Sequence, residues 1–200
     1  VIGFEPSHQE YNIFTQSEGK LMNLVADIVI NATYSYSNSL LNIFGLEEDM
    51  TEYVLQKTEI PVVRSEKPLP SLTVMDGDFL SIMQTGDDRD LFLIYDVIYS
   101  IVEEERGFFL NKRKEYPTNY EKMLNHGEKY FPFIRGLEHV HSIYGARSVP
   151  VGTSGARRTT RIKAHKNFPG LYSILEGKFI SAPLMAQKVI KQLQGDGILP

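Results

Sequence analysis

The sequence contains no cysteine among its 200 residues. Disulfides, thiolate metal ligands and a cysteine nucleophile are therefore excluded, and the absence agrees with a reducing compartment, so we expect a cytoplasmic protein. Positive charge is also scarce, because 21 lysines and arginines stand against 25 aspartates and glutamates and give a net charge of −4. This balance offers no electrostatic reason to expect nucleic acid or an anionic membrane as a partner.

Long apolar runs and a secretory signal are missing as well. No stretch approaches the roughly 20 apolar residues of a membrane-spanning helix, and the residues after Val1 lack the pattern of a signal peptide. The first residue is not Met, which indicates a fragment, a processed product or a trimmed chain. Hydrophobic residues make up 42% and charged residues 23%, the composition of a folded globular protein of one sizeable domain or two small ones.

The pattern of the N-terminal region predicts strands followed by one short helix. Alternating apolar residues from Tyr11 predict a strand that ends in a turn at 17–20. The β-branched run 26–30 is typical of a strand buried on both faces. Residues 37–44 then form a short helical pattern, and Gly45 follows it as a C-cap.

Residues 51–100 contain several short apolar runs separated by turn signals, which predicts an antiparallel sheet. After it, the charged stretch 103–117 predicts a solvated connector with some helix. A helix is expected from Thr118, because Glu121 three residues on completes a capping box. The strands expected in the sheet are 53–55, 60–63, 72–75, 79–83 and 91–95, with turns at 76–78 and 86–88.

From Leu137 the β patterns return, and the chain closes with a helix. Strands are expected at 139–144, 147–151, 159–163 and 171–175. Ser181 can cap the final helix, whose expected apolar face consists of Ala182, Met185, Ala186, Val189, Ile190 and Leu193. We therefore expect an α+β fold, in which the two ends of the chain form one α/β layer and the middle is inserted as a second lobe.

Three segments, taken in order, carry a resemblance to a known family. Residues 26–33, with the sequence Ala-Asp-Ile-Val-Ile-Asn-Ala-Thr, are similar to a strand of the pattern A-D-x-V-[IV]-N-A-[AT]-G up to its final glycine. Residues 143–150 are similar to a strand of the pattern G-x-R-P-x, and residues 168–182 to a closing strand, turn and helix. This order of motifs resembles the family of D-amino-acid oxidase, glycine oxidase and FAD-dependent glycerol-3-phosphate dehydrogenase, over nearly the whole chain.

The resemblance implies FAD as the cofactor. In the family the first strand passes close to the flavin, and this chain has Tyr34 where small residues or glycine are common. The closing turn and helix N-terminus also meet the flavin, where N–H groups and the helix dipole stabilise the negative charge of the reduced ring. Glu176 replaces the first glycine of the G-G-K turn. The residues that the resemblance places at the flavin are Asn31, Ala32, Gly177, Lys178, Phe179, Ile180 and Ser181.

The resemblance also implies a site for an anionic substrate. In many members the arginine that corresponds to Arg147 faces the substrate, and a guanidinium binds carboxylate or phosphate through two hydrogen bonds. Ser148 stands where the family usually has proline. The family's antiparallel sheet roofs the flavin, so Tyr95 is expected to face the substrate, and Tyr99 too if its strand continues. Either tyrosine can instead fill the core.

A local basic cluster near the C-terminus has two interpretations. It includes Arg158, which could bind a phosphate or carboxylate near Arg147, or it forms a solvated edge. His139 and His141 would face the same way on a strand, but with no cysteine and no third ligand we expect no metal site. The cluster consists of Arg157, Arg158, Arg161, Lys163, His165 and Lys166.

The glycine-rich fingerprint G-x-G-x-x-G, which holds the pyrophosphate in the family, is absent from this sequence. In the family it lies N-terminal to every motif found here. The resemblance thus implies a C-terminal portion, with residues 1–50 and 147–200 belonging to the FAD-binding domain and residues 51–146 forming a substrate-binding lobe. By itself this portion is expected to hold FAD poorly.

The activity that the resemblance implies is oxidation of a small anionic hydroxy acid, amino acid or sugar-derived alcohol by hydride transfer to FAD. No residue stands out as a catalytic base. Two other functions remain open: a binding module that keeps the substrate lobe without flavin chemistry, and an oligomerising scaffold. A small molecule is the expected partner, and the sequence does not determine the oligomeric state.

Overall fold

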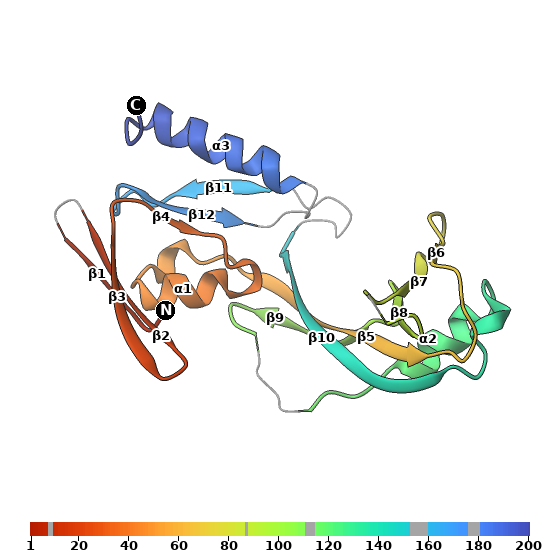
Figure 1. The fold of residues 1–200 in the computed structure, drawn as a ribbon. Coiled ribbons are helices and arrows are strands. Elements are labelled where there is room, and N and C mark those ends of the chain that lie inside the picture. The colour runs from red at the N-terminus through yellow and green to blue at the C-terminus, as the bar shows by residue number, and fades with distance from the viewer. Residues whose placement is uncertain (8–9, 87, 111–114, 153–159, 176–180) are drawn as a thin grey trace. The chain divides into compact units, whose positions relative to one another are not determined.

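The computed structural model describes residues 1–7, 10–86, 88–110, 115–152, 160–175 and 181–200 (Figure 1). The structure is 41% strand and 22% helix, a mixture that is compatible with the expected α+β fold. The chain divides into two compact units. The first unit comprises residues 1–54, 106–110 and 148–200, and the second comprises residues 55–105 and 111–147.

The first unit contains an antiparallel meander of three strands, β1 (Gly3–Pro6), β2 (Tyr11–Ser17) and β3 (Lys20–Ala26). The turn expected at 17–20 is confirmed, since Ser17 pairs with Lys20 and both Glu18 and Gly19 have positive φ. A second small sheet has the order β11-β12-β4, from β11 (Arg161–Ala164), β12 (Leu171–Leu175) and β4 (Val29–Asn31). In it, β12 runs antiparallel to β11 and parallel to β4.

The run expected to form one buried strand over 26–30 is divided between two strands. Strand β3 ends at Ala26, and β4 begins only at Val29, whose N–H donates to Gly170 O at 2.9 Å. A Cβ atom on Gly170 would lie 2.6 Å from Asp27 O, and φ of Gly170 is +94°. The chain therefore bends at Asp27 against a glycine that no other residue could replace without strain. The expectation of burial on both faces is wrong at Ile30, which is 44% exposed.

Helices complete the core of the first unit. Helix α1 (Ser37–Ile43) is followed by Gly45 with φ +70°, as the sequence predicts. Helix α3 (Ala182–Gly195) buries Met185, Val189 and Leu193, whereas Ile190 of its expected apolar face is exposed. Two apolar clusters result, one around β2, β4 and α1 and one between β12 and α3. Their fully buried members are Tyr11, Val29, Leu41, Phe44, Leu46 and Leu171 in the first, and Tyr172, Val189 and Leu193 in the second.

The second unit is built on a sheet of order β10-β5-β8-β7-β6, in which β9 also pairs with β5. The expected antiparallel pairing is confirmed, for example by Ile82 opposite Ile94 and Val62 opposite Leu93. Helix α2 packs against this sheet and encloses a core of Val63, Leu80, Ile82, Phe92, Ile94, Tyr120, Met123, Leu124, Phe131 and Ile134. The elements are β5 (Tyr53–Arg64), β6 (Leu72–Thr73), β7 (Leu80–Gln84), β8 (Leu91–Asp96), β9 (Ile101–Gly107), α2 (Tyr120–Gly127) and β10 (Glu138–Pro150).

Strand β5 is a single strand where the sequence predicts two. Pro61 lies inside it, at the point where β5 changes its partner: Glu59 N–H donates to Ser100 O next to β9, and pairing with β8 begins at Val62. A proline lacks the N–H that a continuous ladder needs, so this change of partner explains how it is tolerated. The break expected between strands 139–144 and 147–151 is absent too, since β10 runs unbroken through Gly145.

The expected connector over 103–117 is wrong in its first part, because residues 101–107 form β9. Among the described strands β9 pairs with β5 alone, and Glu104 and Arg106 on it are exposed. Charged side chains suit such an edge, because they oppose pairing with another chain. Arg106 also binds both carboxylate oxygens of Glu52 at 2.8 Å. The charges thus belong to an edge strand.

Helix α2 starts two residues later than expected, at Tyr120, and its predicted capping box is replaced by Glu59 of β5. The Glu59 carboxylate is fully buried and accepts hydrogen bonds from Thr118 Oγ1 and Asn119 N–H, both at 2.6 Å. Thr118 Oγ1 in turn accepts the N–H of Tyr120 at 3.1 Å. The partner of the first turn is therefore distant in sequence, which is why a local motif with Glu121 fails to predict it.

Candidate functional site

The strand that resembles the family's flavin-adjacent strand ends in a tightly bonded turn. Asn31 is fully buried, and its Nδ2 donates to the carbonyl and hydroxyl oxygens of Ser37, each at 3.1 Å. Its Oδ1 accepts from Thr33 N–H at 3.3 Å and from Thr33 Oγ1 at 2.7 Å. All of its amide groups are thus engaged in shaping the turn between β4 and α1. Ala32 is exposed beside it, so the backbone here is open to a ligand while the asparagine holds its shape.

Tyr34 occupies the position where the family often has glycine, and it has φ +52°. A left-handed backbone costs a non-glycine residue about 1–2 kcal/mol. The side chain is 36% exposed, so packing does not explain this conformation. Tyr34 therefore has a backbone conformation that glycine adopts without this cost.

The parallel pair β4 and β12 brings together the ends of the two strands that precede the predicted cofactor residues. Val29, Ile30 and Asn31 pair in parallel with Leu171, Tyr172 and Ser173. Both carboxyl ends therefore point to one edge, which is where ligands bind in open parallel sheets. Ala32 follows β4 at that edge, and the sequence after β12 leads to Ser181 and α3. Four predicted residues, Gly177, Lys178, Phe179 and Ile180, lie outside the described residues.

Ser181 precedes α3, as the sequence predicts, but its backbone is already helical, with φ −88° and ψ −4°. A capping serine usually has extended backbone angles, so that its side chain can turn back to the first N–H groups. Ser181 is half-buried at the start of the helix. Its place beside the helix N-terminus is therefore confirmed, whereas the expected capping conformation is not.

Arg147 is half-buried in β10, and its Nε atom is fully buried. Among the described residues, no hydrogen-bond acceptor reaches that Nε. A buried donor without a partner is costly, so an acceptor that the described residues do not supply would stabilise this guanidinium. Ser148, which replaces the family's proline, donates a hydrogen bond to Ser35 Oγ at 3.0 Å.

Two described members of the predicted basic cluster, Lys163 and His165, are engaged in contacts within the first unit. Arg158 lies outside the described residues, and Lys163 is engaged in an ion pair with Asp49 at 2.8 Å. His165 is buried, with Nδ1 at 2.5 Å from Asp49 Oδ2 and Nε2 at 2.8 Å from Ser173 Oγ. The chain of Asp49, His165 and Ser173 therefore ties three segments of the first unit together. Ser173 is fully buried, so it is no exposed nucleophile.

The two predicted substrate-binding tyrosines lie in different surroundings. Tyr95 is half-buried on the face of β8 that alternates with the buried Phe92 and Ile94. Strand β8 ends at Asp96, so the condition for Tyr99 to continue that face is not met. Tyr99 packs instead against the core beneath α2 and meets the His126 ring edge-on, with ring centroids 5.3 Å apart. A role in substrate binding stays a prediction for both tyrosines, and Tyr99 also packs against the core.

A buried histidine network in the second unit was not foreseen from the sequence. His126 of α2 is 5% exposed, with Nδ1 at 2.5 Å from Asp96 Oδ2 and Nε2 at 3.0 Å from Asp78 Oδ2. Tyr130 OH also donates to Asp78 at 2.7 Å. Burial alone would lower the pKa of His126, but the hydrogen bonds and charges of the two aspartates outweigh burial and raise it. The same contacts, first that of Tyr130 and then that of His126, lower the pKa of Asp78.

The raised pKa of His126 predicts a stability that falls on the alkaline side. Because the pKa of His126 is raised above its ordinary value of 6.5, its contribution is fully present below pH 6.5 and is lost as the pH rises through the folded-state pKa. Thermal unfolding followed between pH 6 and pH 9 should show a falling midpoint over this range. The slope should disappear in a His126→Gln variant. An unchanged slope in that variant would assign the effect to another group.

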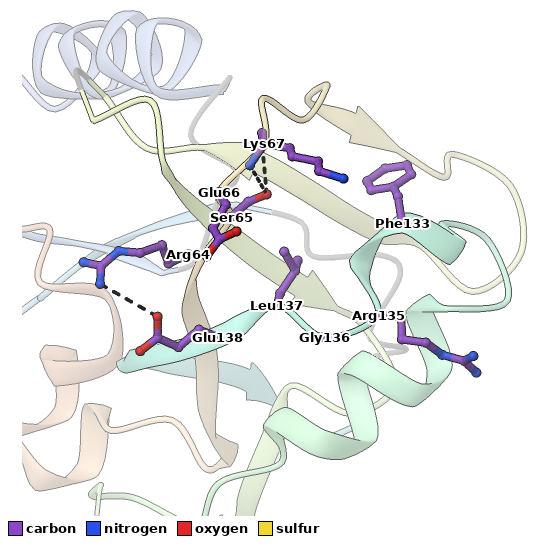
Figure 2. A pocket seen from close by; sticks show the side chains of 9 residues that line it. All are labelled: Arg64, Ser65, Glu66, Lys67, Phe133, Arg135, Gly136, Leu137 and Glu138. Atoms are coloured by element: carbon purple, nitrogen blue, oxygen red, sulfur yellow. Dashed lines mark hydrogen bonds and ion pairs between the residues drawn. The ribbon is translucent and has the colours of Figure 1, made fainter.

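The structure also contains a charged pocket of about 410 Å³ at the other end of β5 and β10 (Figure 2). Arg64 and Glu138 form an ion pair across the strand ends at 3.8 Å, and Ser65 Oγ donates to Lys67 O at 2.7 Å. Arg135, also on its rim, is bound to Glu128. Residues of both charge signs line the pocket, and three of them, Arg64, Glu138 and Arg135, are paired. None of its described lining residues has a buried donor without a partner, as Arg147 has.

The two histidines considered for a metal are occupied or exposed. His139 stacks on Tyr120, with ring centroids 4.6 Å apart, and its Nε2 lies 2.9 Å from Ser142 Oγ. His141 is exposed. In the part of the chain that the structure describes, no three histidines, aspartates or glutamates gather as metal ligands would. None of its helices is both long enough and apolar enough to cross a membrane.

No family model matches this chain, and no curated protein sequence matches it. Several solved structures, however, are similar to it. The chain is similar to glycine oxidase from Bacillus cereus ATCC 14579, with a TM-score of 0.62 and 18% identity over 98% of this chain and 50% of that one. It is also similar to glycerol-3-phosphate dehydrogenase from Bacillus halodurans complexed with FAD, with a TM-score of 0.65 and 16% identity over 96% of this chain and 38% of that one.

A third similar structure is L-proline dehydrogenase from P. horikoshii, with a TM-score of 0.54 and 15% identity over 86% of this chain and 42% of that one. The chain thus spans half or less of the length of these proteins. At such identities the likeness establishes the fold. The resemblance expected from the order of motifs is therefore confirmed: this chain has the fold of a part of the FAD-dependent oxidoreductases related to glycine oxidase and glycerol-3-phosphate dehydrogenase.

Proposed function

We propose that this chain is the C-terminal portion of an FAD-dependent oxidoreductase that oxidises a small anionic substrate. The observation that carries the proposal is the buried, unpartnered Nε of Arg147, on a chain with the fold of FAD-dependent enzymes. A guanidinium that the described residues leave without a partner at Nε has its planar fork of N–H donors to offer, and that fork suits a carboxylate or phosphate. Hydroxy acids, amino acids and sugar-derived phosphates all carry such a group.

The residues at the carboxyl ends of β4 and β12 fit a flavin. The amide of Asn31 is hydrogen-bonded within the turn, and the next residue, Ala32, is exposed. Ser181 stands at the N-terminus of α3, where N–H groups without helical partners favour negative charge. Gly177, Lys178, Phe179 and Ile180 complete the proposed set. The chemistry that bound FAD would supply is the acceptance of a hydride from a C–H bond of the substrate.

In the proposed enzyme, different parts of the chain would bind the cofactor and the substrate. Residues 1–50 and 147–200 would belong to the FAD-binding domain, and residues 51–146 would form the substrate-binding lobe. Arg147, the first residue after that lobe, would hold the anionic group. Tyr95 would contact the substrate from the half-buried face of β8. A tyrosine suits this place because it combines a flat apolar ring with a hydrogen-bonding tip. Arg158 remains a proposed second contact for the anion.

The proposal is tested by a flavin measurement on the whole protein that contains this chain. The purified protein should show flavin absorbance, and the released cofactor should be FAD. The 200-residue chain alone serves as the control and should retain little or none, because the pyrophosphate-binding fingerprint is absent from it. A colourless whole protein that also fails to take up added FAD would overturn the oxidoreductase and favour a binding module without flavin chemistry.

A further inference from the structure

Two buried polar atoms without partners lie on neighbouring strands of the second unit. One is Nε of Arg147 in β10, and the other is Oε1 of Gln56 in β5. Gln56 is only 8% exposed, and within the described residues its Oε1 has no hydrogen-bond donor. The first atom is an N–H donor and the second is an acceptor, so their hydrogen-bonding needs are complementary.

Two contacts along β5 and β10 indicate that these residues lie opposite each other. Val151 N–H donates to Glu52 O at 3.0 Å, which fixes one end. At the other end, a Cβ on Gly145 would lie 3.2 Å from Oγ1 of Thr58. A regular antiparallel ladder between these two contacts puts Arg147 opposite Gln56. Side chains of directly opposed residues point to the same face, with Cβ atoms about 4.5–5.5 Å apart.

A third residue extends the row across the sheet. Nε2 of Gln56 donates to Oε2 of Glu104 in β9 at 2.6 Å, which fixes the orientation of the amide. The Oε1 atom is therefore directed away from Glu104, on a strand whose other neighbour is β10. A carboxylate bound to the N–H side of an amide also strengthens the amide oxygen as an acceptor.

We infer that Gln56 is the positioning residue of Arg147: when an anion binds, Oε1 of Gln56 accepts the Nε–H of Arg147, and Glu104 holds Gln56 in place. The two Nη groups of the guanidinium then remain for the carboxylate or phosphate, as a fork of fixed direction. The inference rests on the proposed function for the identity of the anion. It adds residues that the sequence did not single out.

The pairing is tested directly by NMR of the arginine side chains in the whole protein. The ¹H–¹⁵N signal of Arg147 Nε, assigned with an Arg147→Lys variant, is followed while acetate or inorganic phosphate is added. The wild-type signal should move and exchange more slowly with solvent. In Gln56→Leu neither change should occur, whereas the matched control Gln84→Leu, at an exposed position of β7, should behave as wild type. An Nε signal that responds identically in Gln56→Leu overturns the inference.

Anion affinity gives the second readout. Gln56→Leu should weaken binding of acetate and phosphate about tenfold, the loss of one hydrogen bond to a charged group. The double variant Gln56→Glu/Glu104→Gln exchanges the amide and the carboxylate but keeps an acceptor for Nε–H, so it should recover most of the affinity. A merely structural role would not predict this rescue. Failure of the double variant, with its fold intact by circular dichroism, counts against the positioning role.

The outcomes separate this inference from the proposed function. If the whole protein binds FAD but the Nε signal is independent of Gln56, the inference falls and the proposed function stands. If no FAD is bound but the signal depends on Gln56 and on acetate, the positioning role stands without the oxidoreductase. If no FAD is bound and the Nε signal does not depend on Gln56, both are overturned.

Discussion

Replacing Arg147 with alanine is expected to raise KM for the anionic substrate about 100-fold while changing kcat little. Loss of a desolvated, charge-assisted contact commonly costs about 2–5 kcal/mol, which corresponds to such a factor. The anionic group is bound in the ground state and the transition state alike, so the loss should fall on KM. Arg147→Lys should recover only part of the affinity, because an ammonium offers no planar fork.

The measurement is steady-state kinetics of the whole protein with glycine, glycolate and glycerol 3-phosphate as alternative substrates. FAD content is determined for every variant, so that loss of cofactor is not mistaken for loss of substrate binding. Arg64→Ala is the matched control, since Arg64 lines the charged pocket of Figure 2 and is paired with Glu138. A rise in KM for Arg64→Ala with none for Arg147→Ala would move the anion site to that pocket.

The order of motifs predicted the fold because strands and turns are encoded locally. The turn at 17–20, the C-cap at Gly45 and the antiparallel pairing of β7 with β8 all follow from residues close together in the sequence. Pro61 misled the prediction, since a proline inside an apolar run indicates a break. It is tolerated because β5 changes partner there, and that is a property of the sheet.

The candidate site was only partly accessible from the sequence, for the same reason. Motif order singled out Arg147, and the structure shows its Nε buried without an acceptor in the described residues. The proposed role of Gln56 could not be predicted from the sequence, because it depends on the register of β5 against β10 and on Glu104 in β9. Tyr99 was grouped with Tyr95 by alternation, which ceases to apply where β8 ends at Asp96. Long-range pairing therefore decides which side chains share a site.

Replacing His126 with leucine is expected to destabilise the protein by about 3–5 kcal/mol, the usual consequence of removing one partner from a buried charge pair. Asp96 is fully buried, and its Oδ2 would lose its partner, while Oδ1 would keep the N–H groups of Ile98 and Tyr99. Urea unfolding measures the change, with His141→Leu at an exposed position as the matched control.

A second substitution distinguishes charge from packing in this prediction. Adding Asp96→Asn to His126→Leu removes the uncompensated charge, and the amide oxygen can still accept from Ile98 and Tyr99. The double variant should therefore be more stable than His126→Leu alone, because the cost of burying an unpaired carboxylate is gone. Equal stability of the single and double variants would show that the histidine acts mainly by filling space between α2 and the end of β8. In that case the alkaline loss of stability expected from its raised pKa should be absent as well.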